Sequence, residues 1–238
     1  MNQPRILIVG SANIDLVAGV PRIPRPGETL LGTTFVTVPG GKGANQAVAA
    51  ARLGAQTFFA GCIGADAFGD IQRKTFSEAG IDMTYLKTHP TEPTGTAVIQ
   101  VADDGQNTIV VIPSANSGIL PADIQAMEPF FQDLDAVLVQ LEIPLKTVEA
   151  VFDLAHRTGV LSILDAGPAR PLSPNILSKA DIISPNETEA EIITGVPVKS
   201  LDDAKRAADK LKEMGAREVV LKLGANGALY SGAETFHV

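Results

Sequence analysis

The chain has 238 residues, 45% of them apolar, so it is long enough to bury a substantial core and is expected to be globular, with one main domain. Its 19 basic and 27 acidic side chains give a net charge of −8, and the basic residues form no run that could follow a phosphate backbone. Neither a signal peptide nor an apolar stretch of the ~20 residues that a membrane span needs is visible. Nucleic acid and membranes are therefore not expected as partners, and a cytoplasmic location is predicted.

Cysteine and histidine usage narrows the chemistry further. The single cysteine, Cys62, excludes an internal disulfide and is predicted to be a core residue. The three histidines, His89, His156 and His237, lie far apart in the sequence, so no spacing typical of metal ligands appears among them.

Short apolar, β-branched runs alternate with helical patterns along most of the chain. Such runs are typical of buried parallel strands, and they occur at residues 6–10, 57–63, 136–141, 161–165, 182–184 and 219–223. Helical patterns occur at residues 44–53, 68–79, 145–158, 187–194 and 201–214, the last two before the expected C-caps Gly195 and Gly215. The alternation predicts an α/β fold with a doubly wound, mostly parallel sheet flanked by helices, whose ligands bind beyond the carboxyl ends of the strands.

Two regions, about residues 15–38 and 94–112, interrupt that alternation and are rich in Thr and Val. The second contains TAVIQVADDGQNTIVVI, in which two alternating strands flank the turn Asp104-Gly105, so a β-hairpin is predicted. No neighbouring helices are available to cover these strands. We therefore expect a small inserted sheet that acts as a lid or a dimer surface, the alternative being an extension of the main sheet.

A glycine-rich turn at residues 39–53, PGGKGANQAVAAARL, runs directly into an Ala-rich helical pattern. Its glycines allow positive φ and a close approach to main-chain N–H groups, and the start of a helix adds partial positive charge. Lys42 and Asn45 would add side-chain donors, which suits a polyhydroxylated or anionic ligand. The run matches neither GxxxxGK[ST] nor GxGxxG. A close-packed turn without a ligand is the alternative.

Polar side chains also follow two of the predicted strands. Asn13 and Asp15 come shortly after the first strand, and as alternate residues of an extended chain they would project to one face and could hold adjacent hydroxyls. Glu142 closes the run AVLVQLE in a similar way. Plain explanations exist for both, because Asx residues often form turns and a strand often ends where the chain meets water.

Two later segments suit a nucleotide and its metal. In ISPNETEAE, Asn186 and Glu189 lie three apart on one helix face, where they could orient hydrated Mg²⁺ near phosphates, although a helix cap would explain the same residues. In VVLKLGANGALYS, Gly224 and Gly227 would give a nucleotide close access to the backbone, although a β-hairpin connection would look the same.

Taken in order, GSANID, PGGKGANQAVAAARLG, TGTAVI, SPNETEAE and KLGANG resemble the ribokinase branch of the PfkB carbohydrate kinase family over nearly the whole chain. The resemblance implies ATP-dependent phosphorylation of D-ribose to D-ribose 5-phosphate, with Mg²⁺ and, for the full-length family, K⁺. It also implies a homodimer formed through the β lid. A related sugar or nucleoside kinase and a non-catalytic sugar-binding module are the alternatives.

The resemblance also implies roles for particular positions. The ribose-binding positions of the family are matched by Asn13, Asp15, Gly41, Lys42, Asn45 and Glu142. The magnesium and phosphate motif is matched by Asn186 and by Glu189, the latter reaching the ion through water. The ATP-binding region is matched by Gly224 and Gly227. Lys222 stands where Thr is frequent, so nucleotide contacts there are expected to differ.

The sequence departs from the family pattern because it contains no DTxGAGD segment, which in the family supplies the anion hole and the catalytic Asp. The nearest substitutes, Asp66 and Asp70, precede a helical pattern and are interpreted as helix-start residues. The sequence is therefore interpreted as one ribokinase-like domain over residues 1–238, incomplete at its C-terminus. It is expected to hold no catalytic base, to be nearly inactive as a kinase and to have low stability or aggregate.

Overall fold

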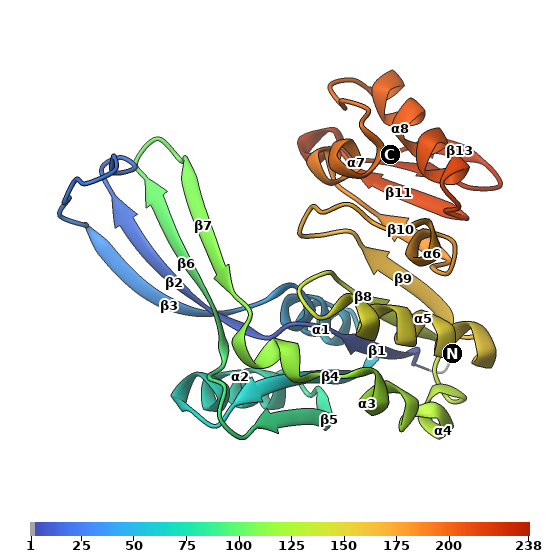
Figure 1. Ribbon diagram of the computed structural model, residues 1–238, viewed down its shortest axis with the longest axis horizontal. Helices are drawn as coiled ribbons and strands as arrows, with labels where there is room; N and C mark the ends of the chain where they lie inside the picture. Colours follow the sequence, from blue (N-terminus) through green and yellow to red (C-terminus); the bar gives the residue numbers. More distant parts are fainter. Residues whose placement is uncertain (1–2) are drawn as a thin grey trace. The chain divides into compact units, whose positions relative to one another are not determined.

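The computed structural model describes residues 3–238 of the chain. These residues form two compact units: unit 1 contains the chain up to Val9 together with Leu120–Val238, and unit 2 is the continuous segment Gly10–Ile119. Figure 1 shows the elements of both units in the colours of the sequence. Each unit has buried aromatic side chains, such as Phe152 in unit 1 and Phe59 in unit 2, so each contains its own apolar core.

Unit 1 is built on a mostly parallel sheet with the strand order β13-β12-β11-β10-β9-β8-β1 (Figure 1). Its parallel strands are β1 (Arg5–Val9), β8 (Ala136–Val139), β9 (Leu161–Asp165), β10 (Ile182–Ser184) and β11 (Glu218–Lys222). At one edge, β12 (Ala228–Ser231) pairs antiparallel with β11 and with β13 (Thr235–His237). The β-branched and aliphatic residues of the central strands are buried, as strands covered by helices require.

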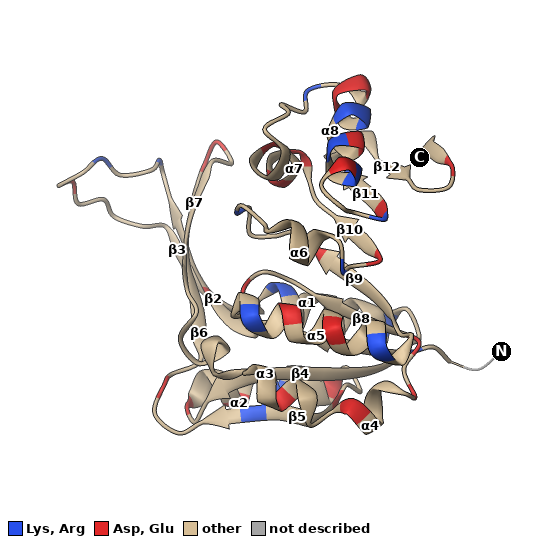
Figure 2. Cartoon of the chain, turned by 45° about the vertical axis from the view of Figure 1, so that its right-hand side comes forward, with Lys and Arg blue, Asp and Glu red and all other residues tan. Residues whose placement is uncertain are grey.

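The helices of unit 1 bury one apolar side each. They are α3 (Pro121–Gln125), α4 (Glu128–Phe131), α5 (Leu145–Thr158), α6 (Pro174–Leu177), α7 (Glu187–Thr194) and α8 (Leu201–Glu213). In α8, Ala204, Ala207, Ala208 and Leu211 are fully buried, which is the i, i+3, i+4, i+7 spacing of one helix face. The opposite face carries both charges, and Figure 2 shows acidic and basic residues alternating along it. Among the helices of residues 3–238, none is long and apolar enough to cross a membrane.

Unit 2 combines a parallel strand pair with a separate sheet. The pair is β4 (Gln56–Gly64) and β5 (Asp82–His89), and its helices are α1 (Lys42–Arg52) and α2 (Ala67–Glu78). In the described chain, the separate sheet has the order β3-β2-β6-β7, and we call it the small sheet. Its strands are β2 (Asn13–Val20), β3 (Thr34–Gly40), β6 (Gly95–Ala102) and β7 (Asn107–Ile112), followed by the 3₁₀ helix η1 (Ser114–Gly118).

The predicted fold class is confirmed, and so is the small sheet as a separate sheet. The strands β9 and β10 and the helices α5 and α7 have the predicted bounds, Cys62 is buried, and β6 and β7 form the predicted hairpin. The predicted strand 136–141 is too long, because it ends at Val139 and the N–H of Leu141 donates to the carbonyl of Gly167. The sequence reasoning missed β5, β13, α3, α4 and α6, of which all but β5 are too short to show a period.

Candidate functional site

Two side chains that the sequence predicts as ligand contacts lie two positions apart at the start of β2. Asn13 and Asp15 are strand residues rather than turn formers, and as alternate residues they project to the same face of the small sheet. Asn13 is 2% exposed, and its Oδ1 accepts a hydrogen bond of 2.6 Å from Nδ2 of Asn116. Asp15 is half-buried against Gly40, where any Cβ would clash with its carboxylate. The lack of a side chain at Gly40 therefore leaves space for the Asp15 carboxylate.

The glycine turn packs tightly against the segment that leads into β2. Gly41 has a φ of 94°, and a Cβ at this position would lie 2.7 Å from the N atom of Asn13, so both conformation and space require glycine. Two amides of the following helix are already used, because the N–H of Gly43 donates to Oγ of Ser11 (3.3 Å) and that of Ala44 to its carbonyl (2.9 Å). These two amides therefore have partners within the protein, and the approach of a ligand to the main-chain amides of this turn stays a prediction.

The two side-chain donors of the turn lie on α1. Lys42 is half-buried at the first residue of the helix. Asn45 is exposed and belongs to the lining of a cavity of about 340 Å³ within unit 2, which is formed by Pro39, Ala44, Asn45, Val48, Ala49, Arg52, Gln72 and Thr75. The structure thus places Asn13, Asp15 and Gly41 near one another, whereas Asn45 faces this cavity one turn into the helix.

The sequence also predicted Asp66 as a helix-start residue, and the structure confirms this. Asp66 is the N-cap of α2 and accepts from the N–H of Gly69 at 2.8 Å. It also accepts from the N–H and the hydroxyl of Thr94, at 2.8 and 2.6 Å. Burial raises the pKa of this carboxyl, but the hydrogen bonds from Thr94 and Gly69 outweigh it, so the pKa lies below its ordinary value. Asp70 lies in the first turn of the same helix, also as predicted.

Glu142, the remaining ribose position implied by the family resemblance, belongs to unit 1. It lies three residues beyond the end of β8, in the loop before α5, and is half-buried. The sequence reasoning placed it directly after the strand, so the position at the carboxyl end of β8 is correct although the strand itself is shorter.

Asn186 and Glu189 form a capping box at the start of α7. The side chain of Asn186 accepts from the N–H of Glu189 at 2.8 Å, and Oε2 of Glu189 accepts from the N–H of Asn186 at 2.8 Å. Glu189 is 4% exposed. The helix-cap explanation is therefore confirmed, and a role in nucleotide or metal binding stays a prediction.

A second acidic side chain, Asp165, which the sequence reasoning missed, joins this cluster. Nζ of Lys222 lies 2.9 Å from Oδ1 of Asp165 and 3.8 Å from Oε2 of Glu189. Asp165 is the last residue of β9, Lys222 the last of β11, and Glu189 follows β10, so the cluster gathers at the carboxyl ends of adjacent parallel strands. A carboxylate closing a buried strand was the available signal for Asp165, as it was for Glu142.

The carboxylates of this cluster can be compared with what a bound Mg²⁺ would need. Among residues 3–238, no group of three His, Cys, Asp or Glu side chains is arranged to hold a metal ion directly. Magnesium keeps several of its waters and takes few protein ligands, so the single buried carboxylate of Glu189 fits an ion that is held through water.

The glycines of the last predicted segment lie in a short turn. η2 (Gly224–Asn226) and Gly227 connect β11 to the antiparallel β12, so the hairpin connection is confirmed, and residues 224–227 are exposed. Beside them is a cavity of about 350 Å³ within unit 1, lined by Glu187, Val198, Lys199, Ser200, Leu201, Leu223, Asn226 and His237. An exposed glycine turn next to a cavity is compatible with nucleotide access.

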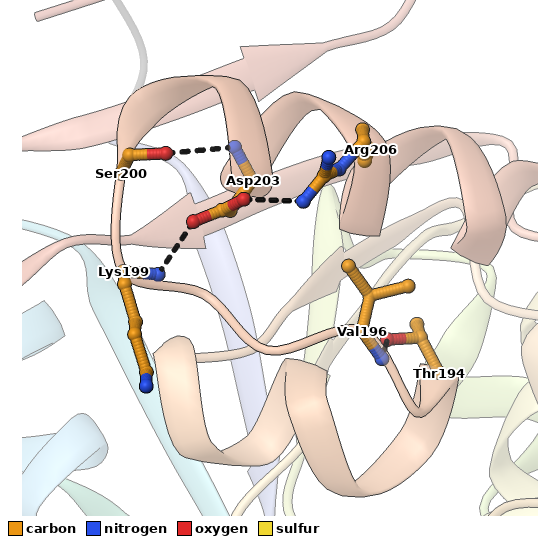
Figure 3. A network of polar contacts seen from close by, with 6 residues as sticks. All are labelled: Thr194, Val196, Lys199, Ser200, Asp203 and Arg206. Atoms are coloured by element: carbon orange, nitrogen blue, oxygen red, sulfur yellow. Dashed lines mark hydrogen bonds and ion pairs between the residues drawn. The ribbon is translucent and has the colours of Figure 1, made fainter.

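Hydrogen bonds order the segment that forms one side of this cavity (Figure 3). Oγ of Ser200 accepts from the N–H of Asp203 at 3.2 Å and so caps α8, while the Asp203 carboxylate accepts from the N–H of Lys199 at 3.1 Å and pairs with Arg206. The hydrogen bonds from Ser200 and Lys199 lower the pKa of Asp203. The loop between α7 and α8 is thus fixed, at the end that leads into α8, by the Ser200 cap.

A mostly parallel α/β sheet, a separate small sheet and polar clusters at strand ends define the class of α/β proteins whose ligand sites lie at the carboxyl ends of strands. Comparison with known proteins is more specific. The model of the pfkB family of carbohydrate kinases matches residues 3–238. The chain therefore belongs to the pfkB family of carbohydrate kinases.

Several relatives are close enough to compare over most of their length. The chain is 44% identical to ribokinase of Haemophilus influenzae over 95% of this chain and 74% of that protein. It is 37% identical to ribokinase of Staphylococcus aureus over 95% and 75%, and 35% identical to deoxyribokinase of Salmonella typhi over 94% and 74%. The structure of Arabidopsis thaliana ribokinase complexed with ribose and ATP has a TM-score of 0.89 at 33% identity, covering 100% of this chain and 78% of that one. The family resemblance drawn from the sequence is confirmed.

Proposed function

We propose that this chain provides the sugar and nucleotide sites of a kinase that transfers phosphate from ATP to D-ribose, giving D-ribose 5-phosphate. The observation that carries the proposal is the cluster of Asn13, Asp15 and Gly41 in unit 2. A buried amide, a half-buried carboxylate and a tightly packed glycine turn lie together there. Donors and acceptors on one face suit adjacent sugar hydroxyls.

In this proposal, Asp15 accepts a hydrogen bond from one sugar hydroxyl while the amide of Asn13 binds its neighbour. Lys42, Asn45 and Glu142 are the further ribose contacts that the family resemblance implies. A half-buried carboxylate binds a hydroxyl more strongly than a neutral acceptor does, because hydrogen bonds to charged groups are stronger. Phosphoryl transfer then depends on the position of the primary hydroxyl and on neutralised phosphate charge.

The nucleotide side of the proposal rests on unit 1. Gly224 and Gly227 let ATP phosphates approach the backbone, Asn186 contacts a phosphate, and Glu189 holds hydrated Mg²⁺ through water. The bound ion supplies positive charge that offsets the developing negative charge of the phosphoryl group. Lys222 brings a cation to the same strand ends, where Asp165 and Glu189 neutralise it. We assign no residue to K⁺ and no catalytic base. A cytoplasmic location stays a prediction.

Calorimetry and a coupled assay on one sample test the proposal. We expect D-ribose to bind with a measurable heat, and we expect a ring of the same size that lacks one hydroxyl, 2-deoxy-D-ribose, to bind more weakly. Turnover is measured with D-ribose, ATP, Mg²⁺ and K⁺ by ADP release. An absence of ribose binding in a folded sample would show that the sugar assignment is wrong.

A second candidate substrate is 2-deoxy-D-ribose, because deoxyribokinases are among the similar proteins. The same calorimetric pair decides between the two sugars. Tighter binding of the deoxy sugar would move the proposal to that substrate while keeping the site.

We extend the proposal to a homodimer formed by the small sheet. Its strands expose large apolar side chains, with Phe35 66% and Val110 62% exposed, and such faces in soluble proteins commonly mark an interface. A second copy of the chain is the occupant that the family resemblance implies. Sedimentation should give a dimer for the unaltered chain and a weakened dimer for Val110→Lys, with Asn107→Lys on the same strand as the control. A monomer at all concentrations would contradict it.

A further inference from the structure

Asn116 is a buried side chain that the sequence reasoning did not single out, and it contacts the start of β2. It lies in η1 and is 1% exposed. Its Nδ2 donates to Oδ1 of Asn13 at 2.6 Å, and its Oδ1 accepts from the N–H of Ala12 at 2.9 Å. Both ends of one amide are therefore bonded to two successive residues that are more than 100 positions away in the sequence.

These two bonds determine the orientation of both amides. The N–H of Ala12 can only donate, so the oxygen of Asn116 must face it and the NH₂ group must face Asn13. That NH₂ group needs an acceptor, so Asn13 must present its oxygen to Asn116 and carry its own NH₂ group on the other edge. The orientation of the Asn13 amide thus follows from the identity of residue 116.

The surroundings make room for this pair and hold it in place. Asn13 pairs with Gly95 in the register of β2 and β6, and a Cβ on Gly95 would clash with both Oδ1 of Asn13 and Nδ2 of Asn116. The N–H of Ala115 donates to the carbonyl of Pro93 at 3.0 Å, which fixes η1. Ser114 has a φ of 44°, a strained value for a residue other than glycine, and such strain persists where neighbouring contacts over-determine the backbone.

The main chain of Asn13 is held by a different residue. Nε2 of the fully buried Gln72 donates to the carbonyl of Asn13 and, at 2.9 Å, to that of Gly40. The strand position of Asn13 therefore has a support that does not involve Asn116. A change at Asn116 should act on the side chain of Asn13 more than on its backbone.

We infer that Asn116 is a positioning residue of the sugar site: it holds the amide of Asn13 with its NH₂ group turned toward the ligand. The inference rests on the proposed sugar-binding role of Asn13. Together with the Asp15 carboxylate, the site then presents a donor and an acceptor on one face. A sugar that offers an acceptor oxygen at one position and a donating hydroxyl at the next fits this pattern.

A double-mutant cycle on D-ribose affinity tests the inference. Asn13→Ala, Asn116→Ala and the double variant are compared by calorimetry with the unaltered chain. We expect Asn116→Ala to weaken binding about 10-fold, the equivalent of losing one buried hydrogen bond, and the double variant to bind within about 2-fold of Asn13→Ala. Effects that multiply independently would overturn the inference.

Asn116→Asp is a nearly isosteric second variant and keeps the acceptor for Ala12. Its other oxygen would face the oxygen of Asn13, so the Asn13 amide should turn over and present its oxygen to the ligand. We expect a loss of ribose affinity at least as large as for Asn116→Ala, at a pH where the new carboxyl is ionised. In Asn13→Ala the same Asp substitution should have little further effect. If Asn116→Ala does not fold, the cycle is run with this variant.

Two control variants distinguish a change in the orientation of the Asn13 amide from a general loss of protein stability. Ser162→Ala removes an equally buried hydroxyl from unit 1, where Ser162 is bonded to Asp181, and should lower the thermal midpoint without changing ribose affinity. Asn107→Ala removes an exposed asparagine of β7 and should change neither. If Ser162→Ala weakens ribose binding as much as Asn116→Ala, a general loss of stability explains the result and the inference fails. If the unaltered chain binds no ribose, the proposed function fails first, which is a distinct outcome.

Discussion

The polar residues assigned to a ligand in unit 2 and those assigned in unit 1 are held by different kinds of contact. Asn13 is bonded to residues 59 and 103 positions away, through Gln72 and Asn116. Asn186 and Glu189 are bonded to each other, three residues apart, in a helix cap. Burying polar groups in a sheet carries a cost, whereas a capping box stabilises its helix even without a ligand. The polar cluster of unit 2 is therefore stronger evidence for a ligand than the capping box of unit 1.

Glycine substitutions should give the largest difference between the two units. Gly41→Ala places a Cβ 2.7 Å from the N atom of Asn13 in a positive-φ position, so we expect a loss of about 3 kcal/mol in the free energy of unfolding. Gly224→Ala also falls at a positive φ, but at 54° rather than 94°, and it has open space, with its nearest neighbour, Glu187, at 3.9 Å, so the loss should be about 1 kcal/mol. Urea unfolding measures both. Equal losses would mean that the glycine turn of unit 2 is not tightly packed.

Removing the acid of the sugar cluster should have the next largest effect. Asp15→Ala loses a charged hydrogen-bond acceptor for a sugar hydroxyl, and we expect D-ribose affinity to fall about 100-fold. Asp103→Ala removes an exposed carboxylate in the turn of the β6–β7 hairpin and is the matched control. Calorimetric titration measures both. An Asp15→Ala variant that binds ribose like Asp103→Ala would remove the main support for the sugar site.

A comparison of two N-caps of unit 1 tests whether Asn186 does more than cap a helix. Asn186→Ala and Ser173→Ala, the latter at the N-cap of α6, each remove a capping side chain, and each should lower the free energy of unfolding by about 1 kcal/mol. Only Asn186→Ala should also weaken the binding of ATP with Mg²⁺, measured by calorimetry. If both variants bind ATP equally well, the capping box explains Asn186 completely, and the contrast between the two units becomes sharper.

The smallest effect concerns acid sensitivity in unit 2. The pKa of Asp66 in the folded protein is below its ordinary value, so the ionised carboxylate stabilises the fold. This stability is fully present above the unfolded-state pKa. It is lost as the pH falls below about 4 and through the folded-state pKa. Asp66→Asn should lower stability at pH 7 by about 1 kcal/mol and flatten the acid side of the stability profile. Asp70→Asn, in the same helix turn, is the charge-matched control, and an equally flattened profile there would refute the assignment.

Much of the fold could be predicted from the sequence because its long elements carry their own period. The helix α5 and the strands β9 and β10 have the predicted bounds, since one-sided or continuous apolar runs mark them. The strand β5 was missed because its burial alternates between half-exposed and exposed residues, with a single buried position at Leu86. Its place was decided by pairing with β4 rather than by a hydrophobic run.

The candidate site was predictable to the extent that its residues lie in recognisable segments. Asn13, Asp15 and Gly41 belong to such segments, and the structure brings them together. Asn116 and Gln72 lie in none, because their importance depends on pairing between residues that are distant in sequence. A single sequence contains no local signal for such a contact.

The division of the chain between the two units has a consequence for the protein during its synthesis. Unit 2 is continuous and is complete at Ile119, whereas β1 pairs on one side with β8, a strand of unit 1 that is synthesised later. Ala136, which pairs with Ile6, follows Ile119 by 17 residues, which at a translation rate of about 5–20 residues per second is a delay of roughly 1–3 s after unit 2 is complete. Over that interval unit 2 can fold, while the three apolar residues that end β1 still lack part of the environment that later buries them completely.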